Sequence, residues 1–195
     1  TIYEALALEK HDLTSALKAY QALLDVLTKH EFKIDGAIKE KPDAAYKYIH
    51  ARYDPQTLEE IWEEWGNKQN DAIGALLFRI GELEKNGVRV LRDINDYRII
   101  QKLIFYLGRV EYWHDEDNGM WEEYEEVHAS SIGAGVAGLK AVKELLYVPE
   151  EYIAKGEEAL ARLLPRESET KDADLALLSL IYPYNVVSSE IMEQI

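Results

Sequence analysis

The sequence contains no cysteine, which excludes disulfide bonds, thiolate metal ligands and a cysteine nucleophile. Basic residues are also scarce: 22 Lys and Arg stand against 37 Asp and Glu, for a formal net charge of -15. A protein that binds nucleic acid or an anionic membrane needs a basic surface, so neither partner is expected. The composition leaves the compartment open and slightly favours the cytoplasm.

Long apolar runs are absent as well. No run reaches the roughly 18 residues of a membrane-spanning helix, and the N-terminus lacks a basic region followed by an apolar one, so neither a membrane span nor a secretory signal is expected. Five prolines and eleven glycines do not cluster, so no linker divides the chain. An apolar content of 47% over 195 residues is enough for one hydrophobic core.

Apolar residues recur at helical spacing through most of the chain. The first such segment turns Leu13, Leu17, Tyr20, Leu24 and Leu27 to one face of a helix. No segment alternates strictly, so the pattern predicts an all-α fold of antiparallel helical hairpins. Further helices are predicted at 58–65 with Thr57 as cap, 71–85, 93–113, 130–146 with Ser130 or Ser131 as cap, 149–164 and 175–181, and irregular chain at 31–42, 46–54 and 113–129.

Both ends of the sequence lie within helical patterns. Thr1 enters one almost directly, and the helix start at Ser188-Ser189-Glu190 is followed by about one turn before Ile195. A helix of one turn is not stable alone. We therefore expect residues 1–195 to be the central part of one domain, truncated at both ends. The remainder of its own chain is the expected partner, and either that remainder or another copy would cover the apolar helix faces.

Residues 114–128 hold seven carboxylates, and several interpretations compete for them. A calcium loop counted from Asp115 would need glycine where Met120 stands, and His114 and His128 alone are weak evidence for zinc. No metal and no cofactor is therefore expected. A solvated acidic loop is the simplest interpretation of the composition.

The chemical alternative is a glycosidase acid. A carboxylic acid beside an aromatic wall keeps its proton to higher pH and donates it to a glycosidic oxygen as the bond breaks. Glu122 stands beside Trp121, which offers such a wall. Trp62, Trp65, Trp113 and Tyr112 are further aromatic faces for sugar rings, although ordinary packing is the better explanation of each one taken singly.

The run from Gly133 to Gly138 has the spacing of a dinucleotide-binding glycine loop. That mechanism requires a strand before the first glycine, and the residues before Gly133 do not form an apolar strand. We expect instead that the run lies inside a helix and lets a neighbouring helix approach closely.

Two motifs carry a resemblance to a known family. Gly119-Met120-Trp121-Glu122-Glu123 resembles the acid-bearing motif of glycoside hydrolase family 15, the glucoamylases and glucodextranases. The segment 65–71, Trp-Gly-Asn-Lys-Gln-Asn-Asp, is similar to the family's Trp-Gly-Arg-Pro-Gln-x-Asp segment, which lines the sugar site upstream of the acid. A closer likeness over about 51–146, carried by 100–106 and 126–133, is to the glucoamylase-like domain of the phosphorylase kinase alpha and beta subunits.

The resemblance implies an (α/α)6 toroid, present here as an incomplete fragment, and an oligosaccharide or glucan as substrate. It assigns Glu122 as the general acid. An inverting mechanism also needs a general base on the opposite face of the sugar. In the family that base lies far downstream, so the 195 residues alone are not expected to hydrolyse a substrate. The residues that the resemblance assigns to substrate binding are Trp65, Gln69, Asp71, Trp121 and Glu123.

Two functions therefore compete at the level of sequence, beside an unrelated helical scaffold in which the acidic loop is merely solvated. The first is a glucan-acting, inverting glycoside hydrolase, and the retention of Glu123 favours it. The alternative is a regulatory or sugar-binding module of the phosphorylase kinase type, without hydrolysis. Asn67 and Lys68 replace the family's Arg-Pro pair, which puts one expected contact with substrate in doubt.

Overall fold

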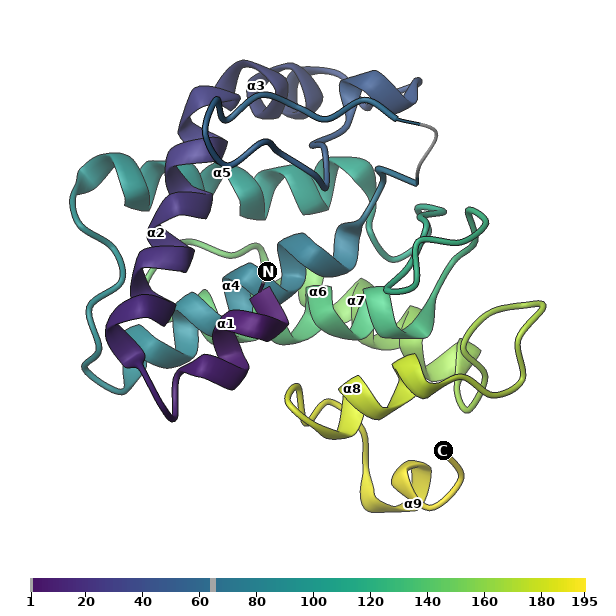
Figure 1. Cartoon of the computed structure of the whole chain (residues 1–195). Coiled ribbons are helices and arrows are strands. Elements are labelled where there is room, and N and C mark those ends of the chain that lie inside the picture. Colours follow the sequence, from purple (N-terminus) through teal and green to yellow (C-terminus); the bar gives the residue numbers. More distant parts are fainter. Residues whose placement is uncertain (1, 64–65) are drawn as a thin grey trace.

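Helices form nearly all of the regular structure in residues 2–63 and 66–195, which the computed structural model describes (Figure 1). No strand occurs in these residues, and only two isolated bridges are present, Tyr53 with Glu60 and Asp117 with Glu126. The predicted all-α class is confirmed. The elements are α1 (Ile2–Leu8), α2 (Leu13–Lys29), α3 (Glu31–Lys39), the 3-10 turn η1 (Ala45–Lys47), α4 (Asn70–Lys85), α5 (Ile94–Val110), α6 (Ala129–Val142), α7 (Glu150–Leu163), η2 (Leu175–Leu177), α8 (Leu178–Ile181) and α9 (Ser189–Met192).

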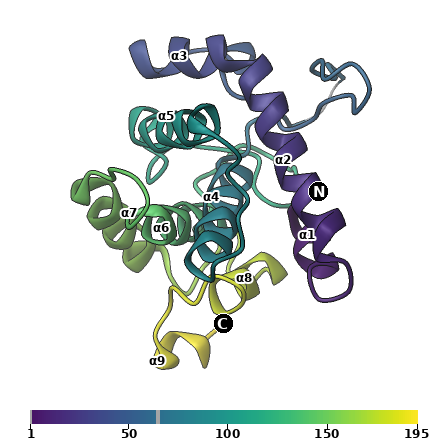
Figure 2. The same cartoon turned by 90° about the vertical axis from the view of Figure 1, so that its left-hand side faces the viewer.

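Helices α4 and α6 lie side by side at the centre of the molecule (Figure 2). Small residues permit this close approach: a Cβ built on Gly74 would lie 2.4 Å from the backbone of Ala134. A Cβ on Gly138 would lie 2.4 Å from the Gly74 carbonyl oxygen. The glycine run therefore belongs to a closely packed helix, as predicted.

Helix α5 packs against α2 and α3 on one side of this centre. It begins at Asp93, whose side chain accepts hydrogen bonds from the amides of Asn95 and Asp96. Its apolar face, which includes Ile99, Leu103 and Leu107, is fully buried. The helical period of the sequence predicted this element and α2, α4 and α7 to within a few residues.

The prediction of irregular chain over 31–42 was wrong, because α3 occupies most of it. Ile34 and Ala37 are buried against α5 and provide the apolar face of the helix. The polar sequence of this segment includes acidic residues that form ion pairs. Glu31 pairs with Arg98 and Lys102, and its Oε1 lies 3.0 Å from Arg98 Nε.

The helix predicted over 58–65 is also absent from its described part, 58–63. The side chain of Asp54 accepts hydrogen bonds from the amides of Gln56 and Thr57, and Leu58 then takes a left-handed backbone conformation with φ 59°. This turn reverses the chain. Glu60, the expected partner in a capping box, instead forms an ion pair with Lys33 at 2.5 Å, so tertiary contacts outweigh the local capping signal.

The first residue of α2 differs from the prediction. Leu13 was expected to face other helices but is 39% exposed, whereas Tyr20 and Leu24 on the same face are fully buried.

In the described residues no helix combines the length and apolar content that crossing a membrane requires.

Candidate active site

Residues 119–123 form a turn, here named the acid turn, that carries the candidate acid Glu122. Gly119 has φ 62° and Glu122 has φ 59°, which is a left-handed conformation that side-chain-bearing residues adopt at a cost. Asn118 stabilises the turn, because its carbonyl accepts from the Glu123 amide at 2.9 Å and its side-chain Nδ2 donates to the Glu123 carbonyl at 2.8 Å. The unusual backbone directs the Glu122 side chain differently from those of its neighbours.

The second motif lies directly against this turn. The amide of Asn118 donates to the Lys68 carbonyl at 2.8 Å, and the Lys68 amide donates to Asn118 Oδ1 at 3.1 Å. The amide of Asn70, the first residue of α4, donates to Asp117 Oδ2 at 2.9 Å. Segments about fifty residues apart in sequence are therefore adjacent in space. Trp65 lies outside the described residues.

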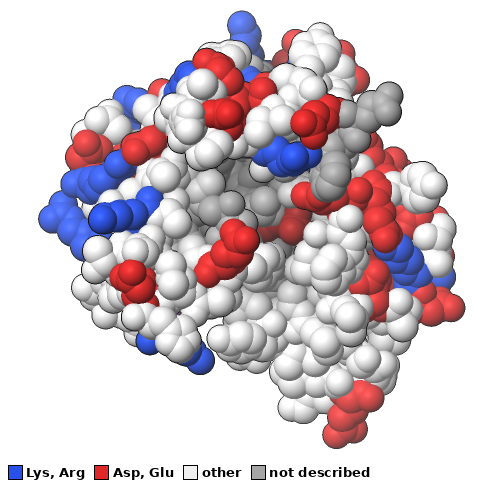
Figure 3. Space-filling view, viewed as in Figure 1, with Lys and Arg blue, Asp and Glu red and all other residues white. Residues whose placement is uncertain are grey.

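A cavity of about 360 Å³ opens beside the two motifs. The face of the molecule seen in Figure 3 is hollowed near its centre, and acidic side chains gather on the right-hand side of that face. The residues that line the cavity come from α1, α2, the 49–53 segment, the start of α4, α5 and the acid turn. Its polar lining includes Tyr3, His50, Gln69, Asp71 and Glu122.

Asp71 is the most deeply buried carboxyl of the cavity lining, with 5% of the residue exposed. Its Oδ1 has no hydrogen-bond partner. Burial raises the pKa of Asp71 to about 6, and the negative charge of Glu122 acts in the same direction, whereas the Ala72 amide and His128 oppose the shift. Asp71 therefore holds a proton more readily than an exposed aspartate does.

The buried Asp117 side chain links three parts of the site by hydrogen bonds. Besides the Asn70 amide, it accepts hydrogen bonds from the Gly119 amide at 3.2 Å and from the Ser131 hydroxyl at 3.0 Å. The residue is fully buried, and this burial raises its pKa, with the charge of Asp71 as a second cause. Asp117 thus joins the start of α4, the acid turn and α6.

His128 lies below the acid turn and is 4% exposed. Its Nδ1 is 3.5 Å from Glu167 Oε1, and its Nε2 has no partner. Burial alone would lower the pKa of His128, but the carboxylates of Glu167 and Asp117 outweigh burial and raise it. Glu167 also accepts hydrogen bonds from the Ser130 amide and hydroxyl, so it caps α6 in place of the serine side chains predicted to do so.

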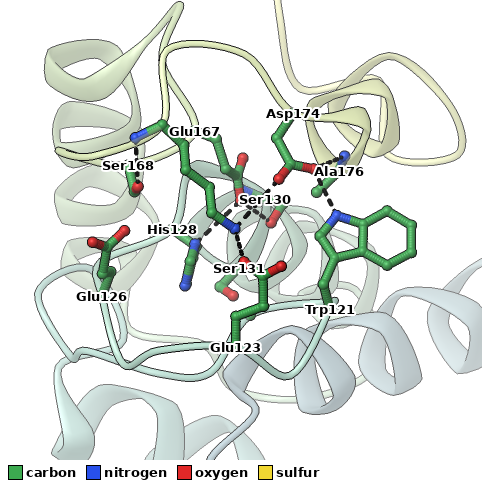
Figure 4. Close-up of polar contacts among 12 residues, drawn as sticks. Trp121, Glu123, Glu126, His128, Ser130, Ser131, Glu167, Ser168, Asp174 and Ala176 are labelled. Atoms are coloured by element: carbon green, nitrogen blue, oxygen red, sulfur yellow. Dashed lines mark hydrogen bonds and ion pairs between the residues drawn. The ribbon is translucent and has the colours of Figure 1, made fainter.

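Trp121 and Glu123 do not line the cavity, and their side chains point toward the segment that follows α7 (Figure 4). The Trp121 indole Nε1 donates to Asp174 Oδ1 at 2.6 Å. Glu123 forms an ion pair with Lys171, which also contacts Asp174. The structure therefore brings Gln69, Asp71 and Glu122 together at one cavity, whereas Trp121 and Glu123 contact Asp174 and Lys171 outside its lining.

Sequence reasoning missed several residues of the cavity. Tyr3 and His50 lie outside both motifs and carry no local signal, because only the fold brings them to the site. His50 packs edge-on against Trp62, with ring centroids 4.6 Å apart.

Tyr112 and Trp113 are buried between helices and contribute packing.

In the part of the chain that the structure describes, no group of three or more His, Asp or Glu side chains could hold a metal ion.

Comparison with curated proteins finds the phosphorylase kinase alpha subunits. The liver isoform of the phosphorylase b kinase regulatory subunit alpha from Takifugu rubripes is 26% identical over 188 residues, covering 86% of this chain and 15% of the relative. The skeletal muscle isoform from Oryctolagus cuniculus is 26% identical over 202 residues, covering 92% of this chain and 16% of the relative. The chain thus spans about a sixth of the length of these relatives.

Comparison with solved structures finds glycosidases. One glycosidase variant superposes with a TM-score of 0.76 at 19% identity, covering 99% of this chain and 57% of the other. A glycosidase in complex with glucose superposes with a TM-score of 0.73 at 21% identity, covering 96% of this chain and 54% of the other. The chain therefore has the (α/α)6 glycosidase fold, and it corresponds to about half the length of the glycosidases that it matches. The model of the glycosyl hydrolases family 15 matches residues 4–162, and the chain belongs to this family.

Proposed function

We propose that the cavity binds a glucose unit of a glucan and that Glu122 is the general acid of an inverting hydrolysis. One observation supports this above others: the side chains of Asp71 and Glu122, from motifs about fifty residues apart, line one cavity of about 360 Å³. Cavities of this size accommodate small ligands, and carboxylates are suited to binding sugar hydroxyls. The glycosidase that was solved with glucose has the same fold, which agrees with the proposal.

The two carboxyls would have different tasks. Glu122 is half-buried on a turn of fixed backbone, and its proton would pass to the glycosidic oxygen as the bond to the leaving sugar breaks. Asp71 is buried at the start of α4 and would bind a hydroxyl of the glucose unit. Inversion further requires a general base roughly 6.5–9.5 Å from the acid, on the opposite face of the sugar, to take a proton from the water that bonds to the anomeric carbon.

A second function has its own support. The curated relatives described above are regulatory subunits, and they match most of this chain. In that case the cavity would bind a sugar without cleaving it. Binding and hydrolysis must therefore be measured separately.

The decisive experiment compares Glu122→Gln with wild type in the native gene product. Glutamine keeps the shape of the side chain but cannot give up a proton, so release of glucose from a maltose-type substrate should fall by at least about a thousandfold. Binding of glucose, measured by calorimetry, should change by less than about threefold. Glu116→Gln, at an exposed position of the same loop, is the matched control.

The outcomes separate the two functions. Undiminished hydrolysis in Glu122→Gln would remove Glu122 from the mechanism. Glucose binding by the wild type without any hydrolysis would favour the sugar-binding module. Absence of binding and of hydrolysis in the wild type would contradict both functions.

A further inference from the structure

Two tyrosines from opposite ends of the described chain meet at the wall of the cavity. Tyr3 in α1 and Tyr184 after α8 are 181 positions apart, and their hydroxyl oxygens are 2.7 Å apart. Tyr184 is 4% exposed and packs edge-on against Phe78, with ring centroids 5.2 Å apart. Tyr3 is 36% exposed and lines the cavity together with Asp71. Tyr184 is thus a fixed support, and Tyr3 is the member of the pair that faces a ligand.

The hydrogen bonding of this pair is incomplete. A tyrosine hydroxyl donates one hydrogen bond and also accepts. Within the described part of the chain, the hydroxyls of Tyr3 and Tyr184 hydrogen-bond only to each other. Whichever of them donates, the other keeps an unused O–H. When the buried Tyr184 donates to Tyr3, the Tyr3 O–H is the unused one, and it is a spare donor at the cavity.

A spare acceptor lines the same cavity as this donor. Asp71 has a buried carboxylate oxygen without a partner, and its side chain lines the same cavity. The negative charge of Asp71 acts on both tyrosines. Burial is the main cause that raises the pKa of Tyr3 to about 12, and Asp71 adds to the shift. Asp71 also contributes to the raised pKa of Tyr184, after burial and Tyr3.

We propose that Tyr3, held by Tyr184, and the Asp71 carboxylate together bind one hydroxyl group of the sugar. An alcohol hydroxyl is both a donor and an acceptor, so it can donate to Asp71 and accept from Tyr3 at the same time. An ether oxygen or a methylene group at this place would leave at least one of the two protein groups unpaired. The corner formed by these residues would therefore select for a free hydroxyl. The inference rests on the proposed function, because it assumes that a sugar occupies the cavity.

The test measures glucose binding by calorimetry in wild type, Tyr3→Phe and Tyr184→Phe. Phenylalanine keeps the ring and removes only the hydroxyl, and unfolding curves would verify that each variant is folded. Tyr3→Phe should weaken glucose binding about tenfold, the effect of one lost hydrogen bond to a ligand. Tyr184→Phe should weaken it by a smaller factor, because it acts through Tyr3. Tyr182→Phe is the control, since Tyr182 is two positions away and 68% exposed.

A set of deoxyglucoses, each lacking one hydroxyl, provides the more specific readout. In the wild type one of these sugars should bind at least about tenfold more weakly than glucose because it lacks the contacted hydroxyl. For that sugar alone, Tyr3→Phe should cause little further loss, since the two changes remove the same contact. A merely structural role of Tyr3 would weaken all the sugars equally.

Two results would overturn the inference while leaving the proposed function intact. One is that Tyr3→Phe binds glucose as tightly as the wild type. The other is that Tyr3→Phe weakens glucose and every deoxyglucose by the same factor. If the wild type binds none of these sugars, both the inference and the proposed function fail.

Discussion

Lys68 and Asn118 exchange two hydrogen bonds across a separation of fifty residues, one between backbone groups and one from the Lys68 amide to the Asn118 side chain. The same side chain donates to the Glu123 carbonyl at 2.8 Å. Asn118 therefore fixes the position of the acid turn relative to the segment that contains Gln69 and Asp71. The geometry of the cavity depends on this residue although it is not among the residues that line the cavity.

Replacement of Asn118 by alanine should destabilise the protein. The change removes both side-chain hydrogen bonds and leaves the Lys68 amide and the Glu123 carbonyl without these partners. The free energy of unfolding should fall by about 2–4 kcal/mol, as measured by urea denaturation. Asn95→Ala, at an exposed position in α5, should change it by less than about 0.5 kcal/mol. Equal effects of the two substitutions would show that Asn118 does not hold the turn.

Replacement of a glycine by alanine should have opposite effects on the free energy of unfolding in α4 and in α3. A methyl group on Gly74 would lie 2.4 Å from the backbone of α6, so the two central helices would have to separate. We expect Gly74→Ala to lower the free energy of unfolding by about 2–3 kcal/mol. Gly36 in α3 has no atom within 4 Å of a built Cβ, so Gly36→Ala should raise it by about 0.5–1 kcal/mol. Thermal unfolding of both variants would measure this contrast, and a stable Gly74→Ala would contradict the close packing of α4 and α6.

The helices of this fold were largely predictable because their signal is local. The apolar residues of α4, such as Ile73, Leu77 and Ile80, recur at helical spacing and are buried. The prediction for 58–63 failed because a competing local turn and a contact distant in sequence decide the structure there. The capping signal at Thr57 lost to the turn built by Asp54 and to the ion pair of Glu60.

The candidate site was predictable only in part, for the same reason. The resemblance named Gln69, Asp71 and Glu122, which do line one cavity, because the order of their motifs in the chain is informative. It could not name Tyr3, because the contact that holds Tyr3 is a hydrogen bond to Tyr184, which is 181 positions away in the sequence. The roles of these residues, and the boundaries of the domain at 1 and 195, stay predictions.

The placement of Glu123 leads to a further prediction. Its carboxylate forms an ion pair with Lys171 and does not line the cavity, although the family resemblance assigns it to sugar binding. If the sugar occupies the cavity, Glu123→Gln should change glucose binding by less than about threefold, whereas Asp71→Asn should weaken it at least about tenfold. Calorimetric titration of both variants would measure the difference. A large loss of binding in Glu123→Gln would mean that the ion pair with Lys171 opens when the sugar binds.

The stability of the protein should depend on pH through Asp71. Burial raises the pKa of this carboxyl to about 6, whereas in the unfolded chain it has its ordinary value near 4. Between these values the folded protein keeps a proton that the unfolded chain has released. As the pH rises from about 4 to about 7, the wild type therefore loses stability at this position, and Asp71→Asn does not.

The difference in free energy of unfolding between Asp71→Asn and the wild type should thus shift in favour of the variant by up to about 3 kcal/mol over this range. Urea denaturation at several pH values from 4 to 7.5 would measure it, and near-ultraviolet circular dichroism would show whether the folded states are alike. Asp172→Asn, whose side chain is 87% exposed, controls for the loss of one carboxyl from the surface. If the difference in free energy of unfolding stays constant with pH, Asp71 ionises in the folded protein as it does in the unfolded chain. Near neutral pH the buried carboxyl would then be available to the sugar only as a charged group.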